Sequence, residues 1–147
     1  MPQLIPPHLH PLVVHFPIVL IPLAAALATY AAWKRPAWTR NALLVLMGLA
    51  AVSAFVADQL GDHELESLRG NLTAEQRAIA HTHEDLGSDT WVAAAALFAV
   101  GVLLRKRLFF SGWLWAYAAL LWALFALVAV AAWYGGALVY EQGVGVP

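Results

Sequence analysis

The chain contains no cysteine among its 147 residues. This excludes disulfides, thiolate nucleophiles, iron–sulfur clusters, cysteine-ligated zinc and covalently attached c-type haem. Charged residues are also scarce, at 12%, which is about half the share usual in a soluble domain. The formal net charge of −1 leaves no basic field for nucleic acid. The metal ligands that remain are six histidines and nine acidic residues.

Apolar residues, in contrast, are abundant. They make up 62% of the chain, against roughly 45–50% in soluble domains, and the mean hydropathy is +0.70. A protein of this size has too little interior to bury that much apolar surface in water. Seven tryptophans are also present, and these rings are enriched at membrane interfaces. The composition therefore predicts an integral membrane protein and argues against a water-soluble enzyme.

The apolar residues fall into four blocks. A membrane-spanning helix needs about 20 residues, and the third apolar run reaches this length only by including the polar turn before it, from Leu86. The predicted spans are residues 12–33, 41–60, 86–104 and 112–134. We therefore expect one all-α domain over residues 1–147, a four-transmembrane-helix antiparallel bundle with an outer loop at 61–85 and a tail at 135–147.

The distribution of charge predicts the orientation. Six of the eight basic residues lie in two short loops, around Arg35 and around Arg107, which the positive-inside rule places in the cytoplasm. All nine acidic residues lie toward the other side. Both termini are therefore expected in the periplasm, for a multi-pass protein of the bacterial inner (cytoplasmic) membrane.

Two local signals concern the outer side. Thr73 followed by Gln76 has the spacing of a capping box, which predicts a helix that begins at Ala74 and continues into the third span. The pair Gly135-Gly136 predicts the end of the fourth span. The tail beyond it is interpreted either as a lid over the outer end of the bundle or as a frayed terminus on the membrane surface.

All the histidines lie in the outer half of the predicted bundle. His15 stands inside an apolar run, and an ionisable residue within a membrane is a candidate functional residue. His83 lies within about one helical turn of the predicted membrane edge, at a similar depth. We therefore expect these two side chains to face each other across the bundle.

Two imidazoles on facing helices are the arrangement that holds b-type haem in a membrane bundle. This predicts a b-type cytochrome that transfers electrons between a quinol or membrane partner and periplasmic redox carriers, rather than a stand-alone enzyme. His15 with His83 is the first predicted ligand pair, and His10 and His81 are additional candidate ligands for one or two haems. Phe16 and Trp91 are candidate walls of the haem slot. The simpler interpretation is that small residues and terminal aromatics only serve helix packing and the membrane interface.

Other functions remain open for the same residues. One alternative is a non-redox structural subunit of a larger membrane complex or homo-oligomer. Another is a protein that handles copper or zinc on the periplasmic side, using His8 and His10 with Asp62, His63 and Glu64, although solvated loop histidines are the simpler interpretation of His8 and His63.

Asp58, near the end of the second predicted span, also has two interpretations. It is either a proton-relay acid or a helix-end acid that is hydrogen-bonded to the outer loop.

The opening segment HPLVVHFPI, residues 10–18, resembles the signature HPxxVHFPI of a family of small bacterial four-helix membrane proteins of unknown function. The resemblance extends to HEDLG at 83–87, to GGALVY at 135–140 and to GVGV at 143–146. Genes of this family often lie near those for periplasmic electron-transfer proteins, so the resemblance implies redox work. It also implies haem binding by His10, His15 and His83, whereas His81 matches no position of the pattern.

Overall fold

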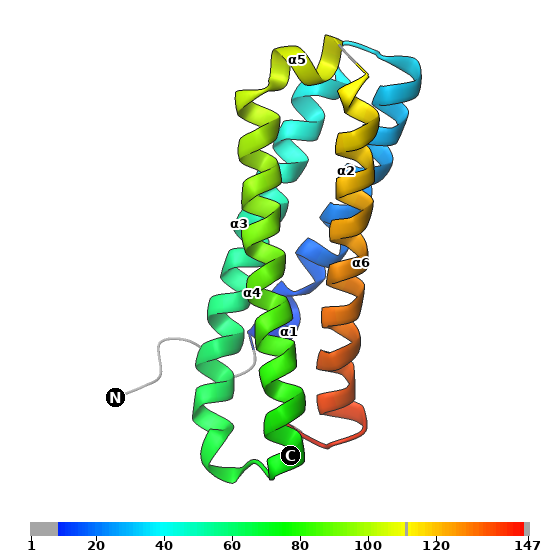
Figure 1. Ribbon diagram of the computed structural model, residues 1–147. Helices are drawn as coiled ribbons and strands as arrows, with labels where there is room; N and C mark the ends of the chain where they lie inside the picture. Colours follow the sequence, from blue (N-terminus) through cyan, green and yellow to red (C-terminus); the bar gives the residue numbers. More distant parts are fainter. Residues whose placement is uncertain (1–8, 111, 146–147) are drawn as a thin grey trace, which may run out of the picture.

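The computed structural model describes residues 9–110 and 112–145, and this part of the chain is helical without any strand. Four long helices stand side by side along one axis (Figure 1). The helices in chain order are α1 (His10–Val13), α2 (His15–Lys34), α3 (Thr39–Leu68), η1 (Arg69–Asn71), α4 (Ala74–Leu103), α5 (Arg105–Phe110) and α6 (Trp113–Tyr140). The predicted all-α class with four membrane-spanning helices is confirmed, because four helical segments are long and apolar enough to cross a membrane.

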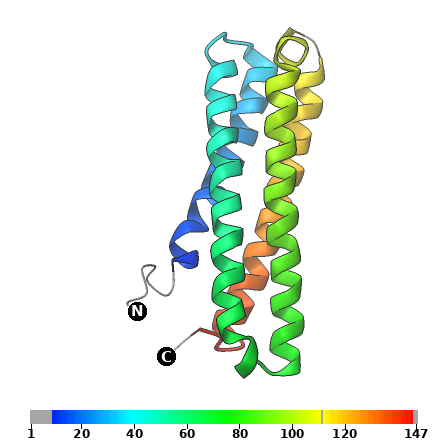
Figure 2. The ribbon, with the colours of Figure 1, turned by 90° about the vertical axis from the view of Figure 1, so that its left-hand side faces the viewer.

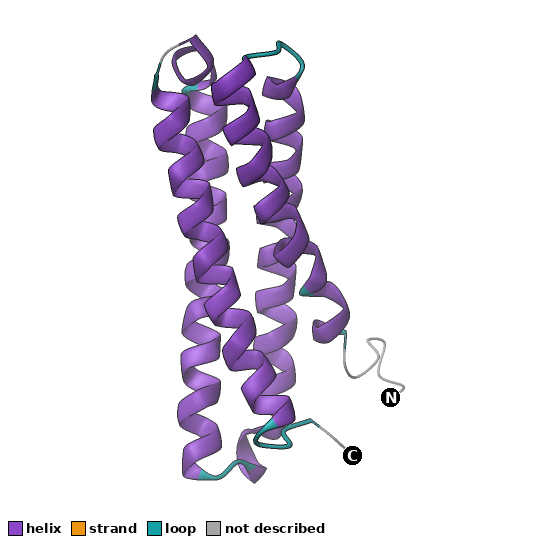
Figure 3. Cartoon of the chain, turned by 90° about the vertical axis from the view of Figure 1, so that its right-hand side faces the viewer, coloured by secondary structure: helices purple, strands orange, loops and turns teal. Residues whose placement is uncertain are grey.

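The four long helices form a closed ring of neighbours. α2 packs against α3 and α6, and α4 packs against the same two helices. Short connections join them (Figure 3), so consecutive helices run in opposite directions, as the sequence colours of Figure 1 show. We call the end with the α3–α4 connection the acidic end and the end with α5 the basic end. α1 and the tail after α6 lie toward the acidic end (Figure 2).

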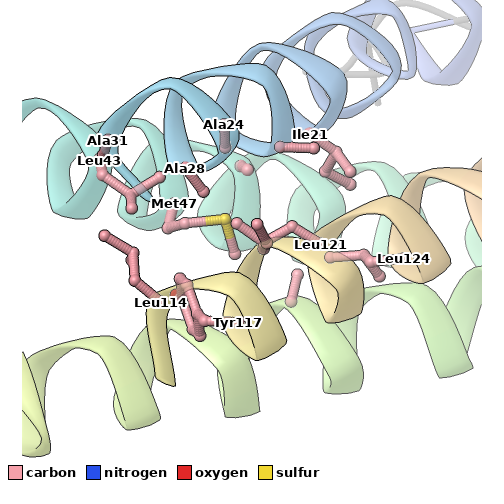
Figure 4. Close-up of a cluster of buried hydrophobic side chains, with 14 of the residues drawn as sticks. Ile21, Ala24, Ala28, Ala31, Leu43, Met47, Leu114, Tyr117, Leu121 and Leu124 are labelled. Carbon is pink, nitrogen blue, oxygen red and sulfur yellow. The ribbon is translucent and has the colours of Figure 1, made fainter. Parts of the chain in front are cut away.

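The half of the bundle nearer the basic end is closely packed. Ile21, Leu43, Met47 and Leu121 are fully buried there (Figure 4). Fully buried alanines of α2 fill the space between these larger side chains, and small residues of this kind let membrane helices approach closely. Large apolar side chains such as Trp113, with 69% of its surface exposed, cover the outside of the bundle, as expected for a surface in contact with lipid.

The α3–α4 connection is much shorter than the outer loop expected from the sequence. α3 continues to Leu68, so most of residues 61–85 is helical and only η1 and two further residues join the helices. The capping box at Thr73 is present: its hydroxyl accepts from the N–H of Gln76 (3.2 Å), and its own N–H donates to the Gln76 side chain (2.8 Å). The prediction of a helix from Ala74 into the third span is confirmed.

The fourth span ends later than the sequence predicted. Gly135 and Gly136 lie inside α6, which continues to Tyr140, so their interpretation as a helix end is wrong. Two glycines weaken a helix by about 1 kcal/mol each relative to alanine, but the following Leu138 is buried against α4 and holds the extra turn in place. The chain reverses only at Gly143, where φ is +65°, a conformation that glycine adopts without a steric penalty.

The tail then folds over the acidic end of the bundle. The side-chain amide of Gln76 donates to the carbonyl of Gln142 (3.0 Å), and the N–H of Val144 donates to the carbonyl of Leu138 (2.9 Å). These contacts tie the tail to the start of α4. Within the described residues, the tail therefore has the position expected of a lid.

The orientation of the bundle can be tested with single cysteines, because the chain has none of its own. Gly70 and Gly112 lie at opposite ends, and a Cβ added at either meets no atom within 4 Å. We expect a membrane-impermeant maleimide to label Gly70→Cys in intact cells and Gly112→Cys only after permeabilisation. The reverse pattern would place the acidic end in the cytoplasm.

Candidate functional site

A cavity of about 420 Å³ lies in the half of the bundle nearer the acidic end, between α1, α2, α3, α4 and α6. Most of its wall is apolar and small, with alanines from α3 and α6 on opposite sides. Its ionisable lining comes from three histidines and four acids: His10, His15, His83, Asp58, Asp62, Glu64 and Glu84. This composition resembles a cofactor or ligand pocket, which is mainly apolar with a few placed polar groups.

Two of the histidines meet within this cavity. The rings of His10, on α1, and His83, on α4, have their centres 5.9 Å apart and their planes at 82° to each other. His10 begins α1, and its imidazole hydrogen-bonds to a backbone carbonyl of α3. His83 lies within α4, and its imidazole hydrogen-bonds to a backbone carbonyl of α6. Two side chains from separate helices thus meet in the cavity. α3 holds the ring of His10, and α6 holds the ring of His83.

The hydrogen bonds set the tautomer of each ring. Nδ1 of His10 lies 2.7 Å from the carbonyl oxygen of Ala57, and Nδ1 of His83 lies 2.9 Å from that of Ala131. A carbonyl only accepts, so both Nδ1 atoms carry the proton and donate it. Each Nε2 then has a free lone pair, and neither has a partner among the described residues. A backbone carbonyl behind Nδ1 is the usual support of a metal-binding imidazole.

Glycines provide the space for both rings. A Cβ at Gly61 would lie 2.9 Å from Cε1 of His10, and a Cβ at Gly135 would lie 2.8 Å from Cε1 of His83. Real Cβ atoms essentially never approach another atom so closely. Each imidazole therefore lies close against a helix backbone, and a larger residue at Gly61 or Gly135 would require the ring to shift. Gly135 gives the His83 ring this space at a cost to helix stability.

α1 and α2 meet at Val14, and this junction carries His10. Pro17 has no N–H to donate to the carbonyl of Val13, and its ring crowds that carbonyl, so one intrahelical hydrogen bond is missing here although Val14 keeps helical dihedral angles (φ −59°, ψ −24°). α1 packs against α3, where the carbonyl of Ala57 accepts the hydrogen bond from His10. The sequence motif at residues 10–18, which contains His10, His15 and Pro17, thus forms this side of the cavity.

Residues 6–147 match a protein family described as "Predicted membrane protein (DUF2231)". The chain belongs to this family. The match includes His10, His83, Gly61, Gly135 and the tail, of which Val144 and Gly145 line the cavity. No curated protein and no solved structure gives a significant match. The family description agrees with the four spans, and it states no activity, so the site in this DUF2231 protein has to be interpreted from its own geometry.

The structure brings His10, rather than His15, against His83. His15 lines the same cavity, but its side chain is exposed and has no ring contact with His83. From the sequence, His15 with His83 was the first predicted pair. His10 was an additional candidate ligand, and the family resemblance implied it together with His15 and His83.

Three other predicted site residues lie away from this cavity. His81 forms an ion pair with Asp85 (2.8 Å), and its side chain is 75% exposed. Phe16 is 57% exposed, so the wall role expected for it is not what the structure shows. Trp91 packs on Phe55, with ring centres 5.3 Å apart, outside the lining of the cavity.

The alternative surface metal site falls partly outside the described residues. His63 is exposed, and His8 lies outside the described residues. Among the residues that the structure describes, no group of three or more histidine, cysteine or acidic side chains has the geometry to hold a metal ion. Zinc sites normally use three or four protein ligands, so the bundle presents a two-histidine site and not a zinc-type cluster.

Asp58 has a different environment from the one expected. It is 8% exposed and lines the cavity. The hydroxyl of Ser88 donates to its Oδ1 (3.0 Å), and the side-chain amide of Gln59 donates to its Oδ2 (3.2 Å). Its partner on another helix, Ser88, lies at the end of the segment that was expected to form the outer loop, and this segment is helical at the level of Asp58.

The role of the glycines can be tested with two neighbouring substitutions in α6. Gly135→Ala forces the His83 ring from its place and weakens its hydrogen bond to Ala131, which costs about 0.5–1.5 kcal/mol. Gly136→Ala meets no atom within 4 Å and gains up to about 1 kcal/mol of helix propensity. We expect thermal unfolding in detergent to occur at a lower temperature for Gly135→Ala and at an equal or higher one for Gly136→Ala. Equal stability of the two variants would contradict the packing described here.

Proposed function

We propose that the cavity binds b-type haem, which Nε2 of His10 and Nε2 of His83 would hold through its iron. The observation that carries this proposal is the pair of imidazoles at 5.9 Å whose Nδ1 atoms are both held by backbone carbonyls. Haem needs only two protein ligands because the porphyrin supplies the other four nitrogens. A site with two histidines and no third ligand group in the described part of the chain suits this requirement.

The dimensions of the site support the same ligand. Metal–imidazole bonds are about 2.0 Å long, so two rings on opposite sides of one metal ion have their centres roughly 6 Å apart. The separation of 5.9 Å agrees with this value. The planes at 82° to each other are compatible with two imidazoles on one axis through the iron. The apolar cavity of about 420 Å³ offers room for a flat apolar ring between helices whose facing residues are mostly alanine and glycine.

We further propose that the protein transfers single electrons in the bacterial inner (cytoplasmic) membrane, with the haem on the periplasmic side. Bound haem supplies the change between ferric and ferrous iron. The chain's own residues hold the two imidazoles in one tautomer, and Val144 and Gly145 of the tail after α6 line the cavity at the acidic end. A quinol or a membrane subunit on one side and a periplasmic redox carrier on the other are the proposed partners. One haem is proposed, because His81 lies outside the cavity.

The proposal predicts an absorption spectrum. Protein purified from cells supplied with haem should show the sharp reduced α-band of low-spin haem. His10→Ala and His83→Ala each remove one of the two iron–nitrogen bonds, so we expect the band to be lost or the haem to become high-spin. The helices should remain folded, because backbone hydrogen bonds within each helix do not depend on the cofactor. Circular dichroism of the same samples checks this.

The controls are the histidines outside the pair. His63→Ala and His81→Ala should leave the band intact, because both side chains are exposed away from the cavity. His15→Ala should also keep a low-spin spectrum. A wild-type protein without the band would refute the cytochrome function and favour the structural-subunit or copper alternatives. Loss of the band in His15→Ala, with retention in His10→Ala, would return the ligand role to His15.

A further inference from the structure

Asp58 is an acidic side chain in the apolar part of the bundle, and it has no cationic partner there. Each of its carboxylate oxygens accepts a hydrogen bond from a separate donor, one on Ser88 and one on Gln59. An ionised carboxylate has this acceptor-only pattern. Both donors are neutral, and a charge that is buried without a counter-charge in a membrane is costly. The cost is removed if a positive charge occupies the cavity that Asp58 lines.

The charged groups around Asp58 strengthen this argument. His10 lines the cavity from α1, His15 from α2, Asp62 and Glu64 from α3, and His83 and Glu84 from α4, while α6 contributes Tyr140. Arg69 is bound to Glu84 (2.8 Å) near the acidic end and does not itself line the cavity. The cavity therefore has several carboxylates and no unpaired arginine or lysine in its described lining. Such a site favours a positively charged occupant over a neutral one.

From this we infer that Asp58 is the counter-charge of the oxidised iron and lowers the reduction potential of the site. The inference rests on the proposed haem function. The ferric porphyrin core carries one positive charge and the ferrous core carries none, so a fixed carboxylate in the same low-dielectric cavity stabilises the ferric form. Asp58 is a positioning residue in this role, because it acts through its charge and not as an iron ligand. Ser88 and Gln59 hold that charge in place.

The test is the midpoint potential of the haem in the purified full-length protein, measured by titration with an electrode while the α-band is recorded. Asp58→Asn keeps the shape of the side chain and removes its charge. We expect the ratio of ferrous to ferric haem at a fixed applied potential to rise about tenfold, which is about 59 mV for a one-electron couple. Asp58→Glu retains the charge, and its potential should remain close to that of the wild type.

Asp89→Asn is the matched control. Asp89 follows Ser88 on α4, is exposed, and does not line the cavity, so its removal changes the net charge by the same amount at a similar depth. We expect no shift of comparable size. If Asp58→Asn fails to assemble, Asp62→Asn removes the next carboxylate of α3 that lines the cavity and should raise the ratio in the same direction.

The outcomes separate the two proposals. A low-spin haem whose potential is the same in Asp58→Asn and in the wild type overturns the role of Asp58 and leaves the haem ligands standing. An equal shift in Asp89→Asn overturns it as well, because the effect would then follow the net charge and not the cavity. Absence of haem from the wild-type protein overturns the proposed function itself, and the absorption spectrum reveals this before any titration.

Discussion

The hydrogen bonds from His10 and His83 to two backbone carbonyls are the interactions on which the functional half of this bundle depends. Within a membrane, a polar side chain has no water to satisfy it and must find its partner in the protein. These two bonds satisfy both imidazoles through Nδ1 and leave both Nε2 atoms without a partner among the described residues. Each Nε2 atom is thereby left with a lone pair that no described residue uses.

The two halves of the bundle differ in how the space between helices is filled. Near the basic end, leucine, methionine and alanine side chains fill it completely. Near the acidic end, Gly61 and Gly135 have no side chain to occupy the space between the helices. The rings of His10 and His83 lie there instead. The hollow is therefore a consequence of particular residues and not of loose packing. The cavity lies at the level where α1 begins. α3 and α4 extend past this level toward the acidic end (Figure 2).

Electrostatics give the cavity its character. Asp58 is held as a hydrogen-bonded acceptor between α3 and α4, and three further carboxylates line the same space. Arg69 near the acidic end is paired with Glu84. The proposed haem would use both features of this cavity, its apolar wall and its carboxylates.

The sequence by itself determined the four helices and the Thr73 cap, because hydropathy over about 20 residues and a capping box are local properties. It also placed the histidines in one half of the bundle. Only the tertiary structure decided that His10 meets His83, that α6 continues through Gly135, and that Asp58 bonds to α4. These features depend on the junction of α1 and α2 at Val14 and on which residues of separate helices lie at the same level along the bundle. The periodicity of a single segment does not encode either. The pair Gly135-Gly136 would favour a helix end on local grounds, yet it lies inside α6, with the imidazole of His83 in the space beside Gly135.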